Sequence, residues 1–225
     1  MESFASFPLY HLLHHSPNFF STIFGVAPHN PVAPFTSSGR SLVAAGYSLY
    51  SASTELILAF RSNDGSSTII GFALCDGTFY LSRPHISCPS WGPFYSLNEA
   101  REPDWPEGLR QWIQDAKCGR LEHAQNTKYS SRYVCSLCAD VHRTLLKGGW
   151  AGNPRPHLRL LYEAAPMAFL CEAAGGRGSD GTQDILDIVP RQLHDRICVF
   201  LGSRLDIDRL ETYGDVQQGS KKYTN

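Results

Sequence analysis

The sequence predicts a mixed α/β fold in which strands of mixed sheets alternate with packed helices. Three observations carry this prediction. Short apolar strands with turn signals between them fill residues 21–82, and helical patterns alternate with strand patterns from residue 107 onward. Hydrophobic residues make up 42% of the 225 residues and charged residues 18%, which is ordinary globular usage.

The segment 21–82 is predicted to contain strands and turns. STIFGVA (21–27) forms a short strand, ELILAF (55–60) a buried strand, and STIIGFAL (67–74) its hairpin partner across the SNDGSS turn. TFYLS (78–82) is a further strand after the turn CDG, whereas the small and aromatic residues of SLVAAGYSLY (41–50) favour a packed helix or turn. We expect 21–27 and 55–60 to be open edges that pair or aggregate, and the chain to be marginally stable.

Two amphipathic helices are predicted next. The first covers PEGLRQWIQDAK (106–117), ends at Cys118–Gly119, and has an apolar face made of Leu109, Trp112, Ile113 and Ala116. The second covers SRYVCSLCADVHRTLLKGG (131–149), with an apolar stripe made of Val134, Leu137, Cys138, Val141 and Leu145.

The segment HLRLLYE (157–163) alternates as a strand, and Pro166 begins the helix PMAFLCEAAGG (166–176) after it. Glu163 is therefore expected at the carboxyl end of a strand, just before a helix, where α/β folds place ligands. DILDIVP (184–190) and ICVFLGS (197–203) are predicted as two more strands, followed by a short helix from about Asp206.

Charge and cysteine usage restrict the partners and the compartment. The net charge of -1 shows no overall excess of positive charge of the kind that binds nucleic acid. No apolar run approaches the roughly 18 residues typical of a membrane span. The seven cysteines are odd in number and mostly lie in apolar stretches, so we expect buried thiols in a reducing compartment, the cytoplasm.

Several long blocks resemble the class 1 fructose-1,6-bisphosphatase family in order and spacing over roughly residues 21–213: STIFG, LVAAGYSLY, YSLNEA, YSSRYVCSLCADVHRTLLKGG, LRLLYEAAPMAFLCEAAGG, LDIVPRQLHDR and VFLGS. The resemblance implies a layered sugar-phosphatase fold, incomplete in its amino-terminal half. It also implies Mg2+-dependent hydrolysis of the 1-phosphate of fructose 1,6-bisphosphate, in gluconeogenesis and carbohydrate metabolism, by a homotetramer.

The resemblance also divides the chain. Residues 1–20 are an undetermined leader, and 21–82 match a remnant of the amino-terminal metal domain. Residues 83–213 match the carboxyl-terminal sugar-phosphate-binding α/β domain, and 214–225 form a tail.

The family's site residues transfer to matching positions of this sequence. Asn98, Arg132 and Tyr133 occupy positions that hold the 6-phosphate in the family, the arginine being lent by a neighbouring subunit. A guanidinium binds phosphate bidentately, while an amide and a phenol add uncharged donors. Glu163 matches a metal-ligating glutamate, and Arg159 stands before it as a substrate-binding residue.

Departures from the family concern both the substrate and the metal. His157 stands where the family has Lys, so a permanent charge becomes a mostly neutral donor near pH 7. Arg101 replaces a Tyr, and a second family Tyr has no equivalent in the shortened WAGNPRP (150–156), so preference could shift to another sugar bisphosphate. The acidic Asp-Pro-Leu-Asp-Gly-Ser-Ser-Asn segment is missing before TIFG, where the only acid ahead of Glu55 is Glu2.

No catalytic residue is therefore assigned, and two hypotheses stay open. One is a bisphosphatase whose further carboxylates come from residues not present in this chain. The other is a catalytically dead remnant or subunit that binds sugar phosphate or joins full-length partners. A zinc-binding interaction module is a distant third.

Three further motifs have simpler interpretations. The run Asp64-Gly65-Ser66-Ser67 imitates the acidic segment but is typical of a hairpin turn. A possible zinc set, more simply explained by core packing on one helix, consists of Cys135, Cys138 and His142. A possible chelating cluster in the leader, more simply a solvated segment, consists of His11, His14 and His15.

Overall fold

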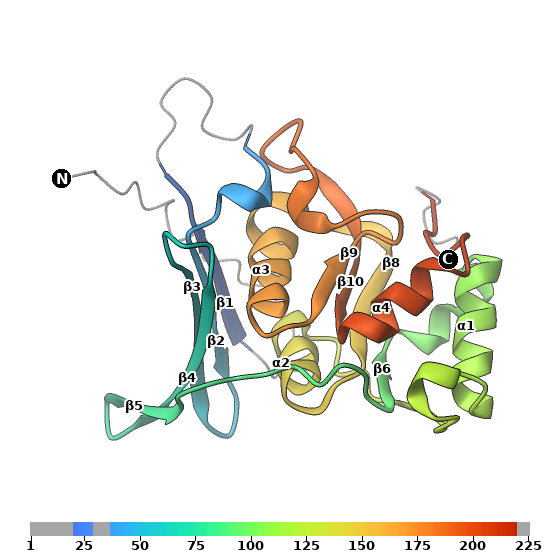
Figure 1. Ribbon diagram of the computed structural model, residues 1–225, viewed down its shortest axis with the longest axis horizontal. Coiled ribbons are helices and arrows are strands. Elements are labelled where there is room, and N and C mark those ends of the chain that lie inside the picture. The colour runs from blue at the N-terminus through green and yellow to red at the C-terminus, as the bar shows by residue number, and fades with distance from the viewer. Residues whose placement is uncertain (1–19, 29–36, 220–225) are drawn as a thin grey trace.

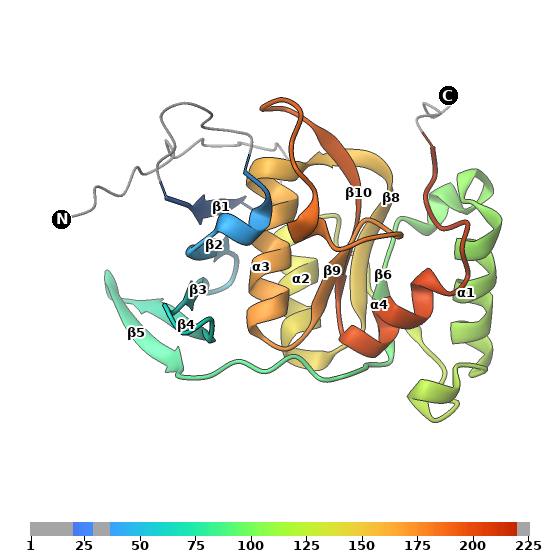
Figure 2. The same ribbon diagram turned by 45° about the horizontal axis from the view of Figure 1, so that its top comes forward.

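A computed structural model of the chain describes residues 20–28 and 37–219. Figure 1 shows four layers: a first sheet, here called sheet A, then α2 and α3, then a second sheet, sheet B, and finally α1 and α4. The turned view of Figure 2 keeps α2 and α3 between the two sheets. Within the ranges that the structure describes, no helix has the length and apolar character needed to cross a membrane.

Sheet A is an antiparallel meander in chain order. Its strands are β1 (Phe20–Val26), β2 (Ala44–Tyr50), β3 (Thr54–Arg61), β4 (Ser67–Cys75) and β5 (Thr78–Arg83). One face buries Tyr47, Ile57 and Ile69 against the central helices, which confirms the strands predicted at 21–27, 55–60, 67–74 and 78–82.

The small residues of SLVAAGYSLY belong to β2, so the prediction of a helix or turn there is wrong. A side chain at Gly46 would place its Cβ 2.6 Å from the Phe24 ring and 2.8 Å from the Ile57 carbonyl oxygen. The absence of a side chain at this position thus lets three strands approach closely, so the glycine is required by packing and does not indicate a helix or turn.

The edges of sheet A differ in part from those expected. β3 pairs with both β2 and β4, so ELILAF is a central strand and its predicted open edge is wrong. β1 pairs only with β2 among the strands that the structure describes, so 21–27 is an edge of this sheet as predicted. The stability of the chain stays a prediction.

Sheet B is mixed and has the order β7-β6-β8-β10-β9. Its strands are β6 (Phe94–Ser96), β7 (Ser130–Ser131), β8 (Trp150–Arg159), β9 (Arg177–Ser179) and β10 (Arg196–Gly202). β6 is parallel to β7 and β8, whereas β10 is antiparallel to β8 and β9. The segment WAGNPRP belongs to β8. Its two prolines are tolerated where the register with β10 shifts between Ile197 and Val199.

The α-helices that complete the layers in the described residues are α1 (Glu107–Cys118), α2 (Leu137–Lys147), α3 (Ala165–Ala173) and α4 (Arg204–Glu211). The predicted apolar face of α1 is buried, and Gly119 ends the helix in the left-handed conformation. α2 begins later than predicted, because Cys135 has a φ of 65° and the Val134 N–H donates to the Asp140 carboxylate at 3.2 Å.

The strand predicted at 157–163 is confirmed only for 157–159, and the strand predicted at 184–190 is a helical turn instead. The chain leaves β8 at Arg159 and forms a π-helical turn over Leu160–Ala164. DILDIVP contains a 3-10 turn at Ile185–Asp187. The strand at 197–203 and the helix near Asp206 are confirmed as β10 and α4. The domain boundaries at 82 and 213 stay predictions, and one core cluster includes residues of both sheets.

Candidate functional site

Two of the predicted phosphate residues lie where neighbouring parallel strands end. Tyr95 of β6 is opposite Ser131 of β7, Asn98 follows β6 by two residues, and Arg132 follows β7 directly. The carboxyl ends of parallel strands meet at one edge of a sheet, which is where such folds bind ligands. The structure thus brings Asn98 and Arg132, both exposed, to the same edge of sheet B.

Arg132 is positioned by the main chain and by an aromatic ring. Its N–H donates to the Tyr95 carbonyl at 2.8 Å, and its guanidinium donates to the Ser131 carbonyl at 2.7 Å. The guanidinium carbon lies 5.5 Å from the centroid of the Phe94 ring, a favourable distance for a cation over an aromatic ring. A guanidinium has five N–H donors, so these contacts orient the fork and leave donors for an anion.

Tyr133 lies in the loop between β7 and α2 rather than at a helix start. Its side chain is exposed, and its hydroxyl donates to the Cys135 sulfur at 3.1 Å. The left-handed conformation of Cys135 turns the chain toward α2. Arg132 and Tyr133 are therefore adjacent on an exposed loop at the edge where Asn98 lies.

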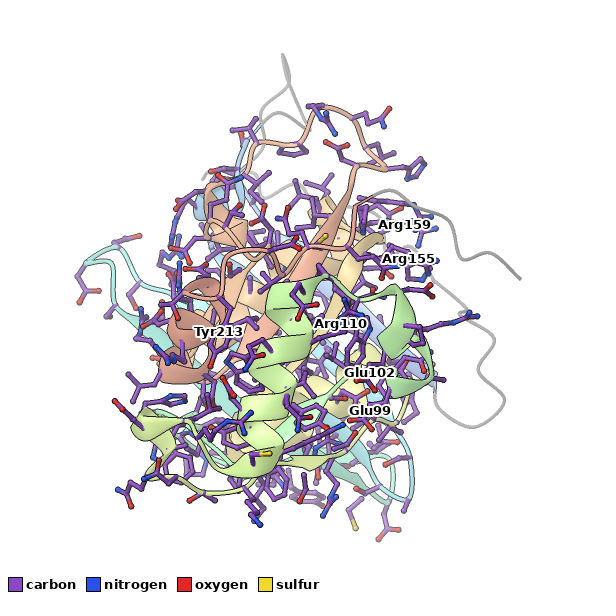
Figure 3. All side chains as sticks on the ribbon, turned by 90° about the vertical axis from the view of Figure 1, so that its right-hand side faces the viewer. Glu99, Glu102, Arg110, Arg155, Arg159 and Tyr213 are labelled. Carbon is purple, nitrogen blue, oxygen red and sulfur yellow. The ribbon has the colours of Figure 1, made fainter. Side chains whose placement is uncertain are left out.

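The second group of predicted residues lies on β8, which runs parallel to β6 and continues past its end. Arg155, His157 and Arg159 occupy every second position at the end of β8. The register with β10 shifts over residues 154–157, so it is the contact between Arg155 and His157 that places these two side chains together. A guanidinium nitrogen of Arg155 lies 3.3 Å from His157 Nδ1, and Arg159 is opposite Arg196 of β10. Figure 3 labels Arg155 and Arg159, which both come from β8, on the same side of the molecule. We call these three residues the β8 stripe.

Glu163 is buried in the π-helical turn that follows the β8 stripe, not at a strand end as predicted. Its Oε2 accepts the N–H of Arg159 at 2.7 Å and lies 3.7 Å from a guanidinium nitrogen of the same residue. The turn is anchored from outside, because the Leu160 N–H donates to the Asp195 carbonyl at 2.7 Å. Glu163 is thus held next to the last member of the stripe.

A metal site requires more oxygen ligands than Glu163 supplies. Across residues 20–28 and 37–219, no group of three or more His, Cys, Asp or Glu side chains is placed to hold a metal ion. The Glu163 carboxylate is a suitable oxygen donor for a divalent cation, but Arg159 already occupies Oε2. By itself this residue set does not fit a metal centre.

Of the possible zinc set, Cys138 packs in the core as the simpler interpretation predicts, whereas the prediction that Cys135 packs on the same helix is wrong. Cys135 is exposed and lies outside α2, whereas Cys138 is buried on it. Burial raises the pKa of the Cys138 thiol to about 12, which opposes the thiolate form that zinc requires. The Tyr47 hydroxyl lies 2.8 Å from His142 Nδ1, so this ring nitrogen is engaged in the core.

Asp64 belongs to the hairpin turn between β3 and β4, as its simpler interpretation predicts. Its carboxylate accepts the Ser66 N–H at 2.9 Å and the Ser66 hydroxyl at 2.7 Å, which holds the pKa of this carboxyl below its usual value. The leader cluster of His11, His14 and His15, and also Glu2, lie outside the described residues.

Sequence reasoning missed two parts of this region. Arg155 was not singled out, although the spacing of basic residues in RPHLR (155–159) puts it at the same alternating positions as His157 and Arg159. The support of the π-helical turn also went unnoticed. The Tyr162 hydroxyl lies 2.7 Å from His194 Nδ1, a contact across 32 positions that no local pattern reveals.

Comparisons with known proteins agree with this geometry. Residues 88–215 match the family model "Fructose-1-6-bisphosphatase, C-terminal domain". A class 1 fructose-1,6-bisphosphatase from Sorangium cellulosum is 42% identical over 205 residues, which cover 85% of this chain and 57% of the relative. A chloroplastic fructose-1,6-bisphosphatase from Brassica napus is 40% identical over 183 residues, covering 78% of this chain and 43% of the relative.

Solved structures give the same result. The apo crystal structure of Leishmania major fructose-1,6-bisphosphatase superposes with a TM-score of 0.78 at 33% identity, covering 88% of this chain and 67% of that chain. The architecture is therefore that of a layered α/β sugar phosphatase. From the match over residues 88–215, the chain belongs to the fructose-1,6-bisphosphatase family. It spans about half the length of the curated relatives it matches.

Proposed function

We propose that this chain carries the sugar-phosphate-binding part of a fructose-1,6-bisphosphatase, a phosphoric monoester hydrolase of gluconeogenesis and carbohydrate metabolism. The observation that supports it best is the meeting of Asn98 and Arg132 at the carboxyl ends of the parallel strands β6 and β7. The ligand would be fructose 1,6-bisphosphate or a related sugar bisphosphate. We propose a cytoplasmic location and neither a nucleic-acid nor a membrane partner.

The proposed binding chemistry follows from the residue types. Arg132 supplies a permanent charge with paired donors for the 6-phosphate, while the Asn98 amide and the Tyr133 phenol orient it without added charge. Asn98 and Arg132 are both exposed at this edge, so in an oligomer joined there the Arg132 of one subunit would reach the 6-phosphate site at Asn98 of its neighbour. A homo-oligomer, by family a tetramer, is the corresponding proposal for assembly.

Hydrolysis of the 1-phosphate additionally needs Mg2+ and several carboxylates. We propose Glu163 as one Mg2+ ligand, with the remaining ligands supplied by residues not present in this chain. When bound, Mg2+ would stabilise charge on the transferred phosphoryl group and lower the pKa of a bound water. The residues described here instead bind and orient the sugar phosphate next to Glu163.

The contact between Glu163 and Arg159 favours a second candidate function. A carboxylate that accepts the Arg159 N–H and faces its guanidinium is stabilised without a metal. Under this alternative the chain is a catalytically dead subunit that binds sugar phosphate or full-length partners. Both candidate functions use the same phosphate-binding residues, and they differ only in whether fructose 1,6-bisphosphate is hydrolysed.

Calorimetric titration with fructose 6-phosphate tests the shared part. We expect saturable binding by the wild-type protein, and a loss of about tenfold or more in affinity for Arg132→Gln and Asn98→Ala. Arg110→Gln is the matched control, because Arg110 is an exposed arginine of α1 paired with Glu107. Absence of binding by the wild type, or equal binding by all four proteins, would refute the proposed function.

Phosphate release from fructose 1,6-bisphosphate in the presence of Mg2+ separates the two candidates. Turnover that disappears in Glu163→Gln supports the hydrolase. Unimpaired fructose 6-phosphate binding with no release above the protein-free rate supports the binding subunit.

A further inference from the structure

The β8 stripe contains more positive charge than the family resemblance assigns to it. Arg155 precedes His157 by two residues on β8, and Arg159 follows it by two. Arg196 of β10 is opposite Arg159 and donates a hydrogen bond to the His157 carbonyl. Glu163 contacts Arg159 at the far end of the stripe. Three guanidinium groups, those of Arg155, Arg159 and Arg196, are thus gathered along the ends of β8 and β10, which suits an anionic ligand.

The contact between Arg155 and His157 fixes the chemical form of the imidazole. A guanidinium only donates, so when its nitrogen lies 3.3 Å from His157 Nδ1, that ring nitrogen must accept. The ring proton of a neutral imidazole is then on Nε2. His157 therefore presents an uncharged N–H donor, and the charge nearest to it on the stripe is the guanidinium of Arg155.

The place of Arg155 on β8 favours a role at the 6-phosphate end of the ligand. β6 and β8 are parallel, with Ser96 opposite Ala151, and Asn98 lies just past the end of β6. Among the residues of the β8 stripe, Arg155 is the first past that point, whereas Arg159 is next to Glu163 at the far end. Arg155 is half-buried, so its guanidinium is partly screened from water, which strengthens a charged hydrogen bond.

From these observations we propose that Arg155 is a specificity-determining residue of the sugar-phosphate site. It supplies a permanent charge to the phosphate and holds His157 as the Nε2–H donor toward the sugar. This inference rests on the proposed function and deepens it. Where the family places a lysine charge at position 157, this chain places an arginine charge two residues earlier and keeps a neutral donor at 157.

The test is calorimetric titration of the whole chain with fructose 6-phosphate at constant pH and ionic strength. Arg155→Gln keeps most of the side-chain stem and a donor but removes the charge, and we expect about tenfold weaker binding. Adding His157→Lys to this variant returns a charge to the stripe and should restore affinity to within about threefold of wild type. Arg110→Gln removes a guanidinium from α1 and should leave affinity unchanged.

The possible results separate the two proposals. If the wild type binds and Arg155→Gln binds equally well, the role of Arg155 is overturned and the proposed function stands. If Arg155→Gln weakens binding but His157→Lys does not restore it, charge supply by Arg155 is overturned. If the wild type does not bind fructose 6-phosphate, the proposed function fails and this inference fails with it.

A second measurement tests directly whether Arg155 holds the His157 ring in one tautomer. Ring nitrogen NMR shifts of His157 in the wild type should show Nδ1 unprotonated and Nε2 protonated, and Arg155→Gln should lose this single tautomer. Circular dichroism establishes that the variant is folded. A wild-type His157 that carries its proton on Nδ1 would overturn the positioning role.

Discussion

Sheet A and sheet B each have five strands, but they are covered differently. Sheet B buries Val199 and Leu201 on the side of α2 and α3, and Trp150 and Phe200 on the side of α1 and α4. Sheet A buries one face on the central helices. Its other residues include exposed apolar side chains: Phe60, Leu74, Phe79, Tyr80 and Leu81. The proposed site lies on sheet B and the segments after its strands, in the region with two buried faces.

Sheet A and sheet B therefore differ in how much of their stability comes from buried side chains. A sheet covered on both faces removes large aromatic side chains from water on each side, so single losses there are costly. A sheet that buries one face depends on fewer contacts, and substitutions on its exposed positions change little. The family match over residues 88–215 coincides with the doubly covered region.

The largest expected effect is in the core between sheet B and α1. Trp112 is fully buried and its ring centroid lies 5.2 Å from that of Trp150. Trp112→Ala should lower the free energy of unfolding by about 3–5 kcal/mol, measured by urea denaturation. The control Leu81→Ala, at a position on β5 that is 55% exposed, should change it by less than about 0.5 kcal/mol. Equal losses would remove the distinction between the two regions.

An intermediate effect is expected on the covered face of sheet A. Burial raises the pKa of Tyr47 and lowers the pKa of His142, so the Tyr47 hydroxyl stays protonated and donates to a neutral ring at 2.8 Å. Tyr47→Phe leaves His142 Nδ1 without this donor and should cost about 1–3 kcal/mol of unfolding free energy. Tyr50→Phe is the matched control, because its side chain is exposed. If both variants unfold at the wild-type midpoint, this hydrogen bond is not stabilising.

The smallest effect is a pH dependence on the α4 side of sheet B. Asp206 is fully buried, and burial raises the pKa of its carboxyl above the usual 3.8. The folded state then binds a proton more readily than the unfolded state, so ionised Asp206 increasingly opposes folding as pH rises from 3.8 through the raised pKa. Asp206→Asn cannot ionise, so its unfolding free energy relative to wild type should increase by about 1 kcal/mol across that window.

His123 must be controlled in this experiment, since its Nε2 lies 2.8 Å from the Asp206 carboxylate. The same comparison in a His123→Gln background removes that partner, so that burial of Asp206 and its hydrogen bonds from Tyr129 and the Gly92 N–H remain as the source of the slope. Parallel pH curves for the two proteins would contradict the raised pKa.

Local patterns predicted the elements whose signal is complete within a few residues. The face of α1 follows from helical spacing, and β1, β3, β4 and β10 follow from short apolar runs between turn residues. Two failures depended on contacts far along the chain. Position 46 requires a glycine because a Cβ there would meet Phe24 and Ile57 on adjacent strands. The alternation HLRLLYE stops as a strand because Asp195 binds the Leu160 N–H.

In the candidate site, too, some features could be predicted from local sequence and others depend on contacts between distant parts of the chain. The types and positions of Asn98, Arg132 and Tyr133 could be predicted from the resemblance, whereas the meeting of the first two at one sheet edge depends on the pairing of β6 with β7. The position of Glu163 in a π-helical turn could not be predicted, since its strand-like alternation continues past the true end of β8. Arg155 could have been found from spacing alone.

A crystal structure of the whole chain with fructose 6-phosphate tests most directly whether Asn98 and Arg132 bind the 6-phosphate. We expect the 6-phosphate within hydrogen-bond distance of Asn98 and Arg132, at the carboxyl ends of β6 and β7, with the sugar directed along β8 toward Glu163. Density for the ligand at any site remote from Arg132 and Asn98 would contradict it.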